Sequence, residues 1–303
     1  MKLSELLPMI GCEEFEIIKE KEFVFFALSS SILNVDTCIF IDDERVIGDI
    51  TNNVKMVLTN SSLKDKLSDK SHGVCVVDNP RIVFFQLHNY LSKIDGYKRK
   101  KEDVSIGKNC KISPLASIAK YNVTIGDDVV IEEFVVIREN TTIGKGSIIR
   151  AGVIIGGQGF EYKRDDGAIL SVKHVGGVHI GDNVEVRYNT TIDCGLYPWD
   201  DTVIENNCKI DNLVYIAHGV KLSENVLIAG QSGVFGRSDI NENTWIGASA
   251  VISNGIKVGA NASVNIGAIV TKDVEDGISV TGNFAIEHNK FIRHLKEVNT
   301  RLY

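Results

Sequence analysis

The chain has 303 residues, enough for two domains by the usual relation between length and domain number. Its 33 Lys and Arg residues against 40 Asp and Glu residues give a net charge of −7, which argues against a nucleic-acid binder that neutralises phosphates. No apolar run approaches the length of a membrane span, and a Glu-rich segment rather than a signal peptide follows Met1, so we expect a cytoplasmic protein. The scattered cysteines form no Cys-x-x-Cys pair, which favours free thiols.

Residues 1–97 are predicted to form a small α+β domain. Four short apolar runs in this part are typical of buried strands: 23–26, 37–41, 54–59 and 73–77. After Pro80, residues 83–91 place Phe84, Leu87 and Leu91 on one helical face, which predicts an amphipathic helix. A basic, polar run over 98–103 then marks the domain boundary and has the composition of a solvated surface.

An aliphatic residue returns at every sixth position through much of the remaining chain. The two series are Ile125, Ile131, Ile137, Ile143, Ile149, Ile155 and Ile204, Ile210, Ile216, Leu222, Ile228, Val234, Ile240, Ile246, Ile252, Val258, Val264, Val270. A period of six fits neither a helix nor simple strand alternation. It fits a solenoid in which three short sides close a triangular coil, so that residues about 18 apart stack. We therefore predict a mainly β fold, a parallel β-helix over 98–282, with small residues after ladder positions where the chain turns tightly.

The ladder is interrupted twice, over 156–178 and 195–200. Loops that leave a regular solenoid cost ordering entropy and add nothing to its core, so they tend to be functional. Beyond the ladder, residues 283–303 are predicted to form a short C-terminal helix whose apolar residues at helical spacing cap or brace the last coil: Phe291, Leu295, Val298 and Leu302. Because a coil has flat sides, we expect a homotrimer with ligand sites in the grooves between subunits.

His218 is the candidate catalytic residue. It lies two positions after Ile216, which places it at a corner of a coil, where a neutral imidazole can take a proton from an attacking amine or hydroxyl. One coil further lies Gly236, whose N–H could donate to the oxyanion of a tetrahedral intermediate. Counting one coil back predicts Asp200 beneath His218. A base, a backbone donor and a groove suggest acyl transfer, although spacing alone equally allows His218 to be an ordinary corner residue.

Several motifs resemble the UDP-3-O-acylglucosamine N-acyltransferases of lipid A synthesis. They are Gly157-Gln158-Gly159-Phe160, Val178-His179-Ile180-Gly181-Asp182, Ile192-Asp193, Asp200-Asp201-Thr202-Val203-Ile204, Ile210-Asp211-Asn212 and Ile216-Ala217-His218. The early domain also looks like the nucleotide-binding domain of that family, with Val76-Val77-Asp78-Asn79-Pro80 leading into a helix. The resemblance implies a left-handed parallel β-helix trimer in which His218 is the general base and Gly236 supplies the oxyanion N–H.

Three departures from the family pattern bear on the substrates. Asp42-Asp43-Glu44-Arg45 stands where the family carries Asn-Pro-Lys-Tyr beside uracil, the second histidine of the family is replaced near Asn254-Gly255, and the helical extension that grips acyl carrier protein is reduced to 289–303. In addition, 267–274 and 282–285 are similar to the closing segment of CoA-dependent hexapeptide acetyltransferases. These features favour relatives that acylate nucleotide-linked deoxy amino sugars.

The sequence therefore predicts an N-acyltransferase that uses a thioester donor, acyl-CoA in preference to acyl carrier protein, and needs no metal. Its acceptor would be the amine of a nucleotide-linked amino sugar for surface polysaccharide or lipopolysaccharide synthesis. The alternative is a lipid A UDP-3-O-acylglucosamine N-acyltransferase that uses acyl carrier protein. Candidate substrate contacts are Asp193, Asn212, Phe160 and Tyr162, and candidate donor contacts are Gly267, Lys272 and Asn283.

Two interpretations of another class stay open. The first is a γ-type carbonic anhydrase, because His174 and His179 have the five-residue spacing of such a zinc site. A third, upstream histidine would be needed, and none occurs between His88 and His174. The second is a non-catalytic binding scaffold.

Overall fold

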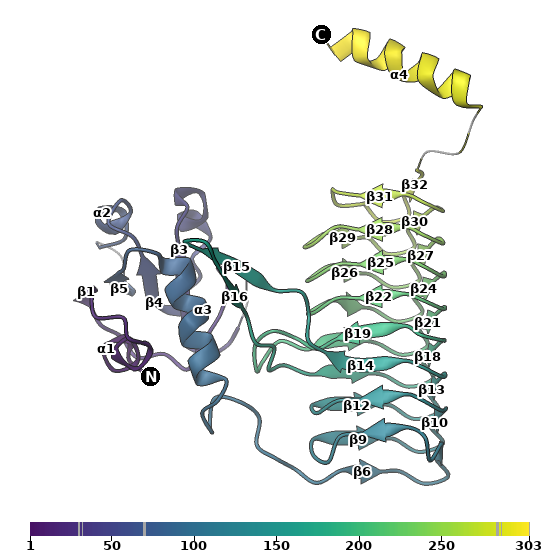
Figure 1. Ribbon diagram of the computed structural model, residues 1–303, viewed down its shortest axis with the longest axis horizontal. Helices are drawn as coiled ribbons and strands as arrows, with labels where there is room; N and C mark the ends of the chain where they lie inside the picture. The colour runs from purple at the N-terminus through teal and green to yellow at the C-terminus, as the bar shows by residue number, and fades with distance from the viewer. Residues whose placement is uncertain (30, 32, 69–70, 283–284, 286, 303) are drawn as a thin grey trace.

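A computed structural model describes residues 1–29, 31, 33–68, 71–282, 285 and 287–302. The chain forms a small N-terminal α/β part, a long β-solenoid beside it, and a C-terminal helix (Figure 1). No helix among these residues is long and apolar enough to cross a membrane. The predicted donor contact Asn283 lies outside the described residues.

The N-terminal part is built on one five-stranded sheet in the order β1-β5-β4-β3-β2. Its strands are β1 (Glu16–Lys19), β2 (Phe25–Phe26), β3 (Thr37–Ile41), β4 (Val54–Thr59) and β5 (Gly73–Val76). Among the described strands of this sheet, only β1 and β5 pair antiparallel. The helical segments are α1 (Leu3–Leu6), η1 (Pro8–Ile10), η2 (Glu44–Asp49), α2 (Lys64–Ser68) and α3 (Pro80–Leu91).

The predicted strands and helix of this part are confirmed, with one strand missed and one helix start corrected. Strand β1 was not predicted because its side chains are mostly exposed and it lacks an apolar run. Helix α3 begins at Pro80 because the Asn79 side chain accepts a hydrogen bond from the Ile82 N–H at 3.2 Å, which caps the first turn. As predicted, Phe84, Leu87 and Leu91 are buried.

The solenoid is a stack of triangular coils whose three sides are parallel sheets. The first sheet comprises β7 (Lys111–Ile112), β10 (Val130–Ile131), β13 (Ile148–Ile149), β18 (Glu185–Val186), β21 (Lys209–Ile210), β24 (Leu227–Ile228), β27 (Trp245–Ile246), β30 (Ser263–Val264) and β32 (Ser279–Val280). The second comprises β8 (Ser117–Ile118), β11 (Val136–Ile137), β14 (Ile154–Gly157), β19 (Thr191–Asp193), β22 (Tyr215–Ile216), β25 (Gly233–Val234), β28 (Val251–Ile252) and β31 (Ile269–Val270). The third comprises β6 (Ser105–Ile106), β9 (Val123–Ile125), β12 (Thr141–Ile143), β17 (Val178–Ile180), β20 (Thr202–Ile204), β23 (Lys221–Leu222), β26 (Asp239–Ile240) and β29 (Lys257–Val258).

The aliphatic ladders form the core of this solenoid, as predicted. Every residue of the two predicted series is buried, and the most exposed of them, Val270, exposes only 6% of its surface. Because each coil contributes one inward residue per side, the core is a continuous column that no single coil could bury alone.

The corners are made differently from the prediction. Most of the non-glycine residues with left-handed backbone are asparagines, typically three places after a ladder residue. Among them Asn207, Asn225, Asn243 and Asn261 form a hydrogen-bonded ladder from coil to coil. The glycine directly after a ladder residue has another purpose. A Cβ on Gly144 would lie 2.4 Å from the Gly181 carbonyl carbon of the next coil, so glycine there permits close stacking of coils rather than a positive φ.

The two interruptions are loops that reach the N-terminal part. The first carries a hairpin, β15 (Tyr162–Asp165) with β16 (Ala168–Ser171), that extends from the solenoid towards α3 (Figure 1). His88 of α3 hydrogen-bonds the Lys173 carbonyl through Nε2 at 2.7 Å, and the Trp199 indole N–H of the second loop donates to the Phe26 carbonyl at 2.9 Å. Val172, Leu196 and Tyr197 join the apolar core of the N-terminal part, so both loops fasten it to the solenoid.

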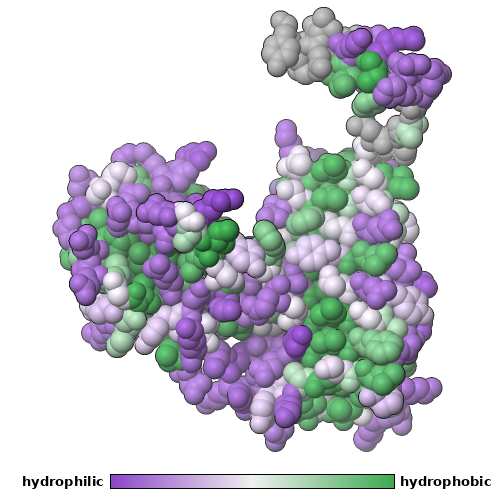
Figure 2. Space-filling view, viewed as in Figure 1, coloured by the Kyte–Doolittle hydropathy of each residue, from purple (hydrophilic) through white to green (hydrophobic). Residues whose placement is uncertain are grey.

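Helix α4 (His288–Leu302) confirms the predicted C-terminal helix but does not cap the last coil. It stands clear of the solenoid (Figures 1 and 2), and Phe291, Leu295 and Val298 expose 45%, 43% and 38% of their surface. The prediction of a brace was wrong because helical spacing of apolar residues shows that a face exists, but not which surface it meets.

Candidate active site

His218 lies at the corner that follows β22, with its side chain only 12% exposed. The imidazole is enclosed by two glycines from different parts of the chain. A Cβ on Gly236, one coil further, would lie 2.8 Å from His218 Nε2, and a Cβ on Gly159, in the first extruded loop, would lie 3.1 Å from its Cδ2. A Cβ at Gly236 would collide with the ring, and one at Gly159 would be tight against it and would lie 2.6 Å from His174 Nε2, so both glycines are required for this placement.

The count of 18 residues per coil, which paired His218 with Gly236, agrees with the observed pairing of Ile216 with Val234. The same count fails in the other direction. Ile216 pairs with Ile192, because the second loop lengthens that coil, so Cys194 rather than Asp200 takes the equivalent corner position below His218. The prediction that Asp200 stacks beneath His218 was therefore wrong in register, although the loop folds Asp200 back towards the site.

Glu161 is a site residue that sequence reasoning missed. Its Oε2 lies 3.6 Å from His218 Nε2, and its other carboxylate oxygen pairs with Lys163. The sequence contained only a weak signal, since Glu161 directly follows the Gly157–Phe160 motif. Its approach to His218 depends on how the extruded loop folds back, which no periodicity describes.

The surroundings keep the His218 imidazole neutral. Burial lowers its pKa from the ordinary value, Glu161 and Asp200 oppose that shift, and Arg237 and Lys163 add to it. Nδ1 is buried without a hydrogen-bond partner among the described residues. A neutral imidazole with an approachable Nε2 is the form that can accept a proton at neutral pH.

The Gly236 N–H is available as a donor. Within the described part of the chain it donates to no acceptor, whereas the neighbouring Arg237 N–H donates to the His218 carbonyl at 3.0 Å. Other coil corners leave the equivalent N–H free as well. The distinguishing feature of Gly236 is that this free N–H lies beside a buried imidazole and carries no side chain.

An ion pair with a buried carboxylate supports the same corner. Arg237 Nη2 lies 2.6 Å from Asp200 Oδ2, and the Arg237 guanidinium sits over the Tyr197 ring at 5.6 Å from its centroid. Asp200 is 7% exposed, and burial raises its pKa while Arg237 opposes the rise. Since Arg237 directly follows Gly236, this pair fixes the backbone that carries the free N–H.

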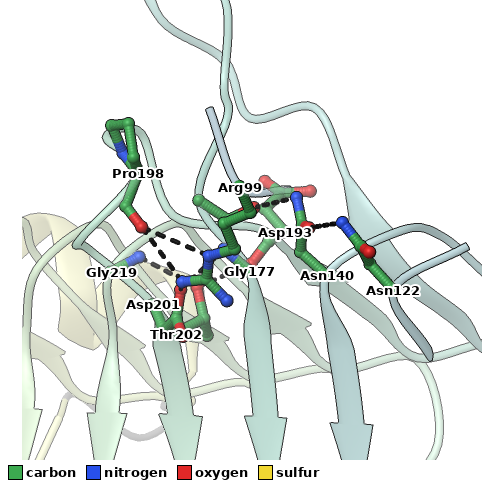
Figure 3. Close-up of polar contacts among 10 residues, drawn as sticks. Arg99, Asn122, Asn140, Gly177, Asp193, Pro198, Asp201, Thr202 and Gly219 are labelled. Carbon is green, nitrogen blue, oxygen red and sulfur yellow. Dashed lines mark hydrogen bonds and ion pairs between the residues drawn. The ribbon is translucent and has the colours of Figure 1, made fainter. Parts of the chain in front are cut away.

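The second predicted acid, Asp193, lies in a polar network on the coil below (Figure 3). The Tyr215 hydroxyl donates to Asp193 Oδ2 at 2.7 Å, and burial raises the pKa of the carboxyl group. The Thr202 hydroxyl donates to the Asp193 carbonyl at 2.6 Å and accepts from the Gly219 N–H at 2.9 Å. Asp193 is thus connected to the residue that follows His218.

Arg99, from the basic boundary segment, ties the second loop to this network. Its Nη2 donates to the Pro198 carbonyl at 3.1 Å and pairs with Asp201, which also accepts from the Gly177 N–H (Figure 3). Part of the basic run predicted to be solvated surface therefore has a structural role.

The other predicted contacts are dispersed. Phe160 and Tyr162 flank Glu161, form a T-shaped pair with centroids 4.9 Å apart, and are 83% and 48% exposed. Asn212 lies at a different corner and accepts from the Tyr188 N–H at 3.2 Å, so it does not orient His218 of its own chain. Lys272 follows β31 on the His218 edge of the solenoid, whereas Gly267 lies at another corner.

The histidines proposed as zinc ligands do not form a pair. His174 is buried with its ring centroid 5.3 Å from that of His218, and burial lowers its pKa to about 3. His179 is exposed within β17. Among the described residues, no group of three His, Cys, Asp or Glu side chains could hold a metal ion.

A cavity of about 570 Å³ adjoins His174 between the boundary segment and the lower coils. Its lining is basic and amide-rich, and includes Lys98, Arg99, Lys101, Arg138, Asn140 and Gln158. Such a lining suits an anionic ligand.

Comparison with known proteins agrees with this geometry. Residues 122–157 and 201–236 match the family model described as bacterial transferase hexapeptide (six repeats). A UDP-3-O-acylglucosamine N-acyltransferase of Campylobacter lari is 30% identical over 94% of this chain and 93% of its own length. This chain belongs to that family of acyltransferases.

Other family members match more locally. The enzyme of the same name from Delftia acidovorans is 34% identical over 46% of this chain, and the match spans about two fifths (41%) of that relative's length. Among solved structures, a UDP-N-acetylglucosamine acyltransferase from Campylobacter jejuni superposes with a TM-score of 0.54 at 24% identity, covering 64% of this chain and 78% of its own. That likeness supports the solenoid fold alone.

Proposed function

We propose that the protein transfers an acyl group from a thioester donor to the amine of UDP-3-O-acylglucosamine. The observation that carries the proposal is the enclosed His218 imidazole beside the free Gly236 N–H, in a chain whose Campylobacter lari relative matches over nearly its full length. UDP-3-O-acylglucosamine is the acceptor given in the names of the relatives. It replaces the deoxy amino sugar of surface polysaccharide that the sequence alone favoured.

The proposed chemistry uses two groups at one corner. His218 Nε2 takes a proton from the acceptor nitrogen as that nitrogen attacks the thioester carbonyl, and the Gly236 N–H stabilises the oxyanion that forms. General-base help contributes about 10²- to 10⁴-fold in rate, and a single oxyanion donor contributes about 10²- to 10³-fold. The resulting imidazolium then protonates the departing thiolate.

The basic cavity next to His174 suits the acceptor's diphosphate. It places Arg138 and Lys101 in the same hollow as the amide side chains of Gln158 and Asn140. Phosphate oxygens are well matched by such donors. We propose that the N-terminal part contributes to nucleotide binding, that Phe160 and Tyr162 contact an apolar part of a substrate, and that three copies complete the sites.

We further propose acyl carrier protein as the donor in preference to acyl-CoA. Helix α4 carries Lys290, Arg293 and Lys296 against one acid, Glu297. A cationic helix that stands clear of the solenoid (Figure 1) suits an acidic carrier protein.

The proposal is tested by mass spectrometry of products from a matrix of donors and acceptors. The purified protein is offered the same acyl group on carrier protein or on CoA, with UDP-3-O-acylglucosamine or a nucleotide-linked deoxy amino sugar. We expect amide formation on UDP-3-O-acylglucosamine, faster from the carrier protein. Turnover of the deoxy sugar from acyl-CoA alone contradicts the proposal.

The choice of donor is tested by reversing charges on helix α4. The double variant Lys290→Glu, Arg293→Glu should raise KM for acyl carrier protein and leave KM for acyl-CoA unchanged.

A further inference from the structure

We propose that Glu161 makes the acceptor site selective for an amine, because its carboxylate receives the protonated amine next to His218. The inference rests on the proposed function, and it assigns a role to a residue that the base and the oxyanion donor leave unexplained. Glu161 would touch the reacting nitrogen, whereas Asp193 and Asp200 would act through neighbouring residues.

The first argument is geometric. Glu161 Oε2 and His218 Nε2 are 3.6 Å apart, too far for a good hydrogen bond and close enough for one atom lying beside both to contact each of them. Such an atom can approach from the Nε2 side of the ring, where Gly236 contributes no side chain. A nitrogen that gives its proton to Nε2 would thus also lie beside the Glu161 carboxylate.

The second argument is that this carboxylate already binds an alkylammonium. Glu161 Oε1 pairs with Lys163 Nζ, which also lies 4.7 Å from the centroid of the Phe85 ring. The side chains of Glu161 and Lys163 are 18% and 22% exposed, so the pair is largely removed from solvent. Oε2 remains directed at the imidazole and is available to a second ammonium.

The third argument concerns the other charges that face the site. Arg237 is held by Asp200 at 2.6 Å, so these two groups largely compensate each other. His174 packs against His218 as a buried ring, and Lys163 is held on the far oxygen of Glu161. Glu161 therefore supplies the anionic oxygen nearest to Nε2 among the described residues.

The chemistry gives this oxygen a use that a hydroxyl acceptor would not need. A sugar amine with an electron-withdrawing neighbour resembles an α-amino group, whose pKa is about 8, so most of it enters as the ammonium at neutral pH. Glu161 binds that cation, which loses one proton to solvent. The amine nitrogen then forms the bond to the carbonyl carbon and gives a second proton to His218. The C–S bond breaks and the sulfur receives that proton, leaving the amide, the thiol and one proton in solvent.

The test compares Glu161→Gln with the wild type by calorimetric binding of two nucleotide sugars at pH 7: UDP-3-O-acylglucosamine, and its counterpart with a hydroxyl in place of the amine. We expect the wild type to bind the amine more tightly and Glu161→Gln to lose about tenfold in affinity for it, in the range of one charged hydrogen bond. Affinity for the hydroxyl compound should not change. The loss should shrink at pH 9, where the amine is neutral, and Glu161→Asp should restore part of it.

Asp166→Asn is the matched control, because it removes one negative charge from the exposed turn of the same hairpin. It should bind both compounds as the wild type does. Equal losses for both compounds in Glu161→Gln, or a loss that persists at pH 9, overturn the inference and assign Glu161 a structural role. Binding requires no turnover, so a wild type that binds both sugars but forms no amide contradicts the proposed function and leaves this test intact.

Discussion

Replacing Gly236 with alanine tests the placement of the base more selectively than deleting the base. The added Cβ would lie 2.8 Å from His218 Nε2 and 2.9 Å from Cε1. Ordinary carbon contacts begin at about 3.5 Å, so the ring must retreat by roughly half an ångström or more. Retreat is limited, because Gly159 and the His174 ring also pack against the imidazole. The N–H of residue 236 is retained, so the perturbation acts on His218 and not on the oxyanion donor.

The expected result is a loss in kcat of about 10²-fold, the usual consequence of misplacing a reacting group by up to an ångström. KM for the acceptor should rise as well, because the added Cβ lies on the Nε2 side of the ring, where the acceptor nitrogen is proposed to lie. Gly236 does not have the left-handed φ that only glycine adopts easily, so the thermal midpoint should fall by only a few degrees. The assay is steady-state release of free thiol, with circular dichroism as the folding check. Gly48→Ala is the control, since its Cβ would meet nothing within 4 Å. A folded Gly236→Ala variant with kcat within about threefold of the wild type would refute the placement.

The remaining predictions concern pH and stability. Burial lowers the His88 pKa to about 4, so between pH 6.5 and 4 the folded state binds fewer protons than the unfolded state. The free energy of unfolding therefore decreases as the pH is lowered through this range, by about 3 kcal/mol from this residue. The lowered pKa of His174 acts in the same direction, so the free energy of unfolding in urea is measured at pH 7 and pH 4.5 for both the wild type and His88→Gln. The wild type should lose more stability between the two pH values than the variant; equal losses in the two proteins contradict the prediction. Because the His218 pKa is also lowered, NMR titration of the substrate-free protein should show the His218 imidazole becoming protonated only below pH 6.5; protonation of this ring above pH 6.5 contradicts the prediction. Ile240→Ala should destabilise the solenoid by about 2–5 kcal/mol, whereas alanine at the adjacent, exposed Asp239 should cost less than about 0.5 kcal/mol in urea unfolding. Similar losses in the two variants would contradict the placement of the ladder residues in the core.

The solenoid was predictable because its core obeys a local rule. Each inward residue, such as Ile228 or Ile246, follows from a count of six along the chain, and each stacking partner follows from a count of eighteen. The pairing of His218 with Gly236 needed nothing more. That count fails wherever a loop lengthens a coil, which is why Asp200 was misplaced while Gly236 was not.

The remainder of the site depends on non-local packing. Glu161 reaches His218 only because an extruded loop folds back on the coil, and Arg237 matters only because a second loop buries Asp200 beside it. Neither contact has a period or a fixed spacing in the sequence. Helix α4 is a further example, because its local helical spacing was predicted correctly and its packing, which depends on distant residues, was not.

The most direct test of the central claim is turnover by His218→Ala with UDP-3-O-acylglucosamine and acyl carrier protein. The wild type should form the amide. The variant should fold, bind the acceptor and lose about 10²- to 10⁴-fold in kcat, the range of general-base catalysis. Turnover like that of the wild type in a folded His218→Ala protein would contradict the account, because the three atoms nearest to a Cβ at Gly236 all belong to the His218 ring.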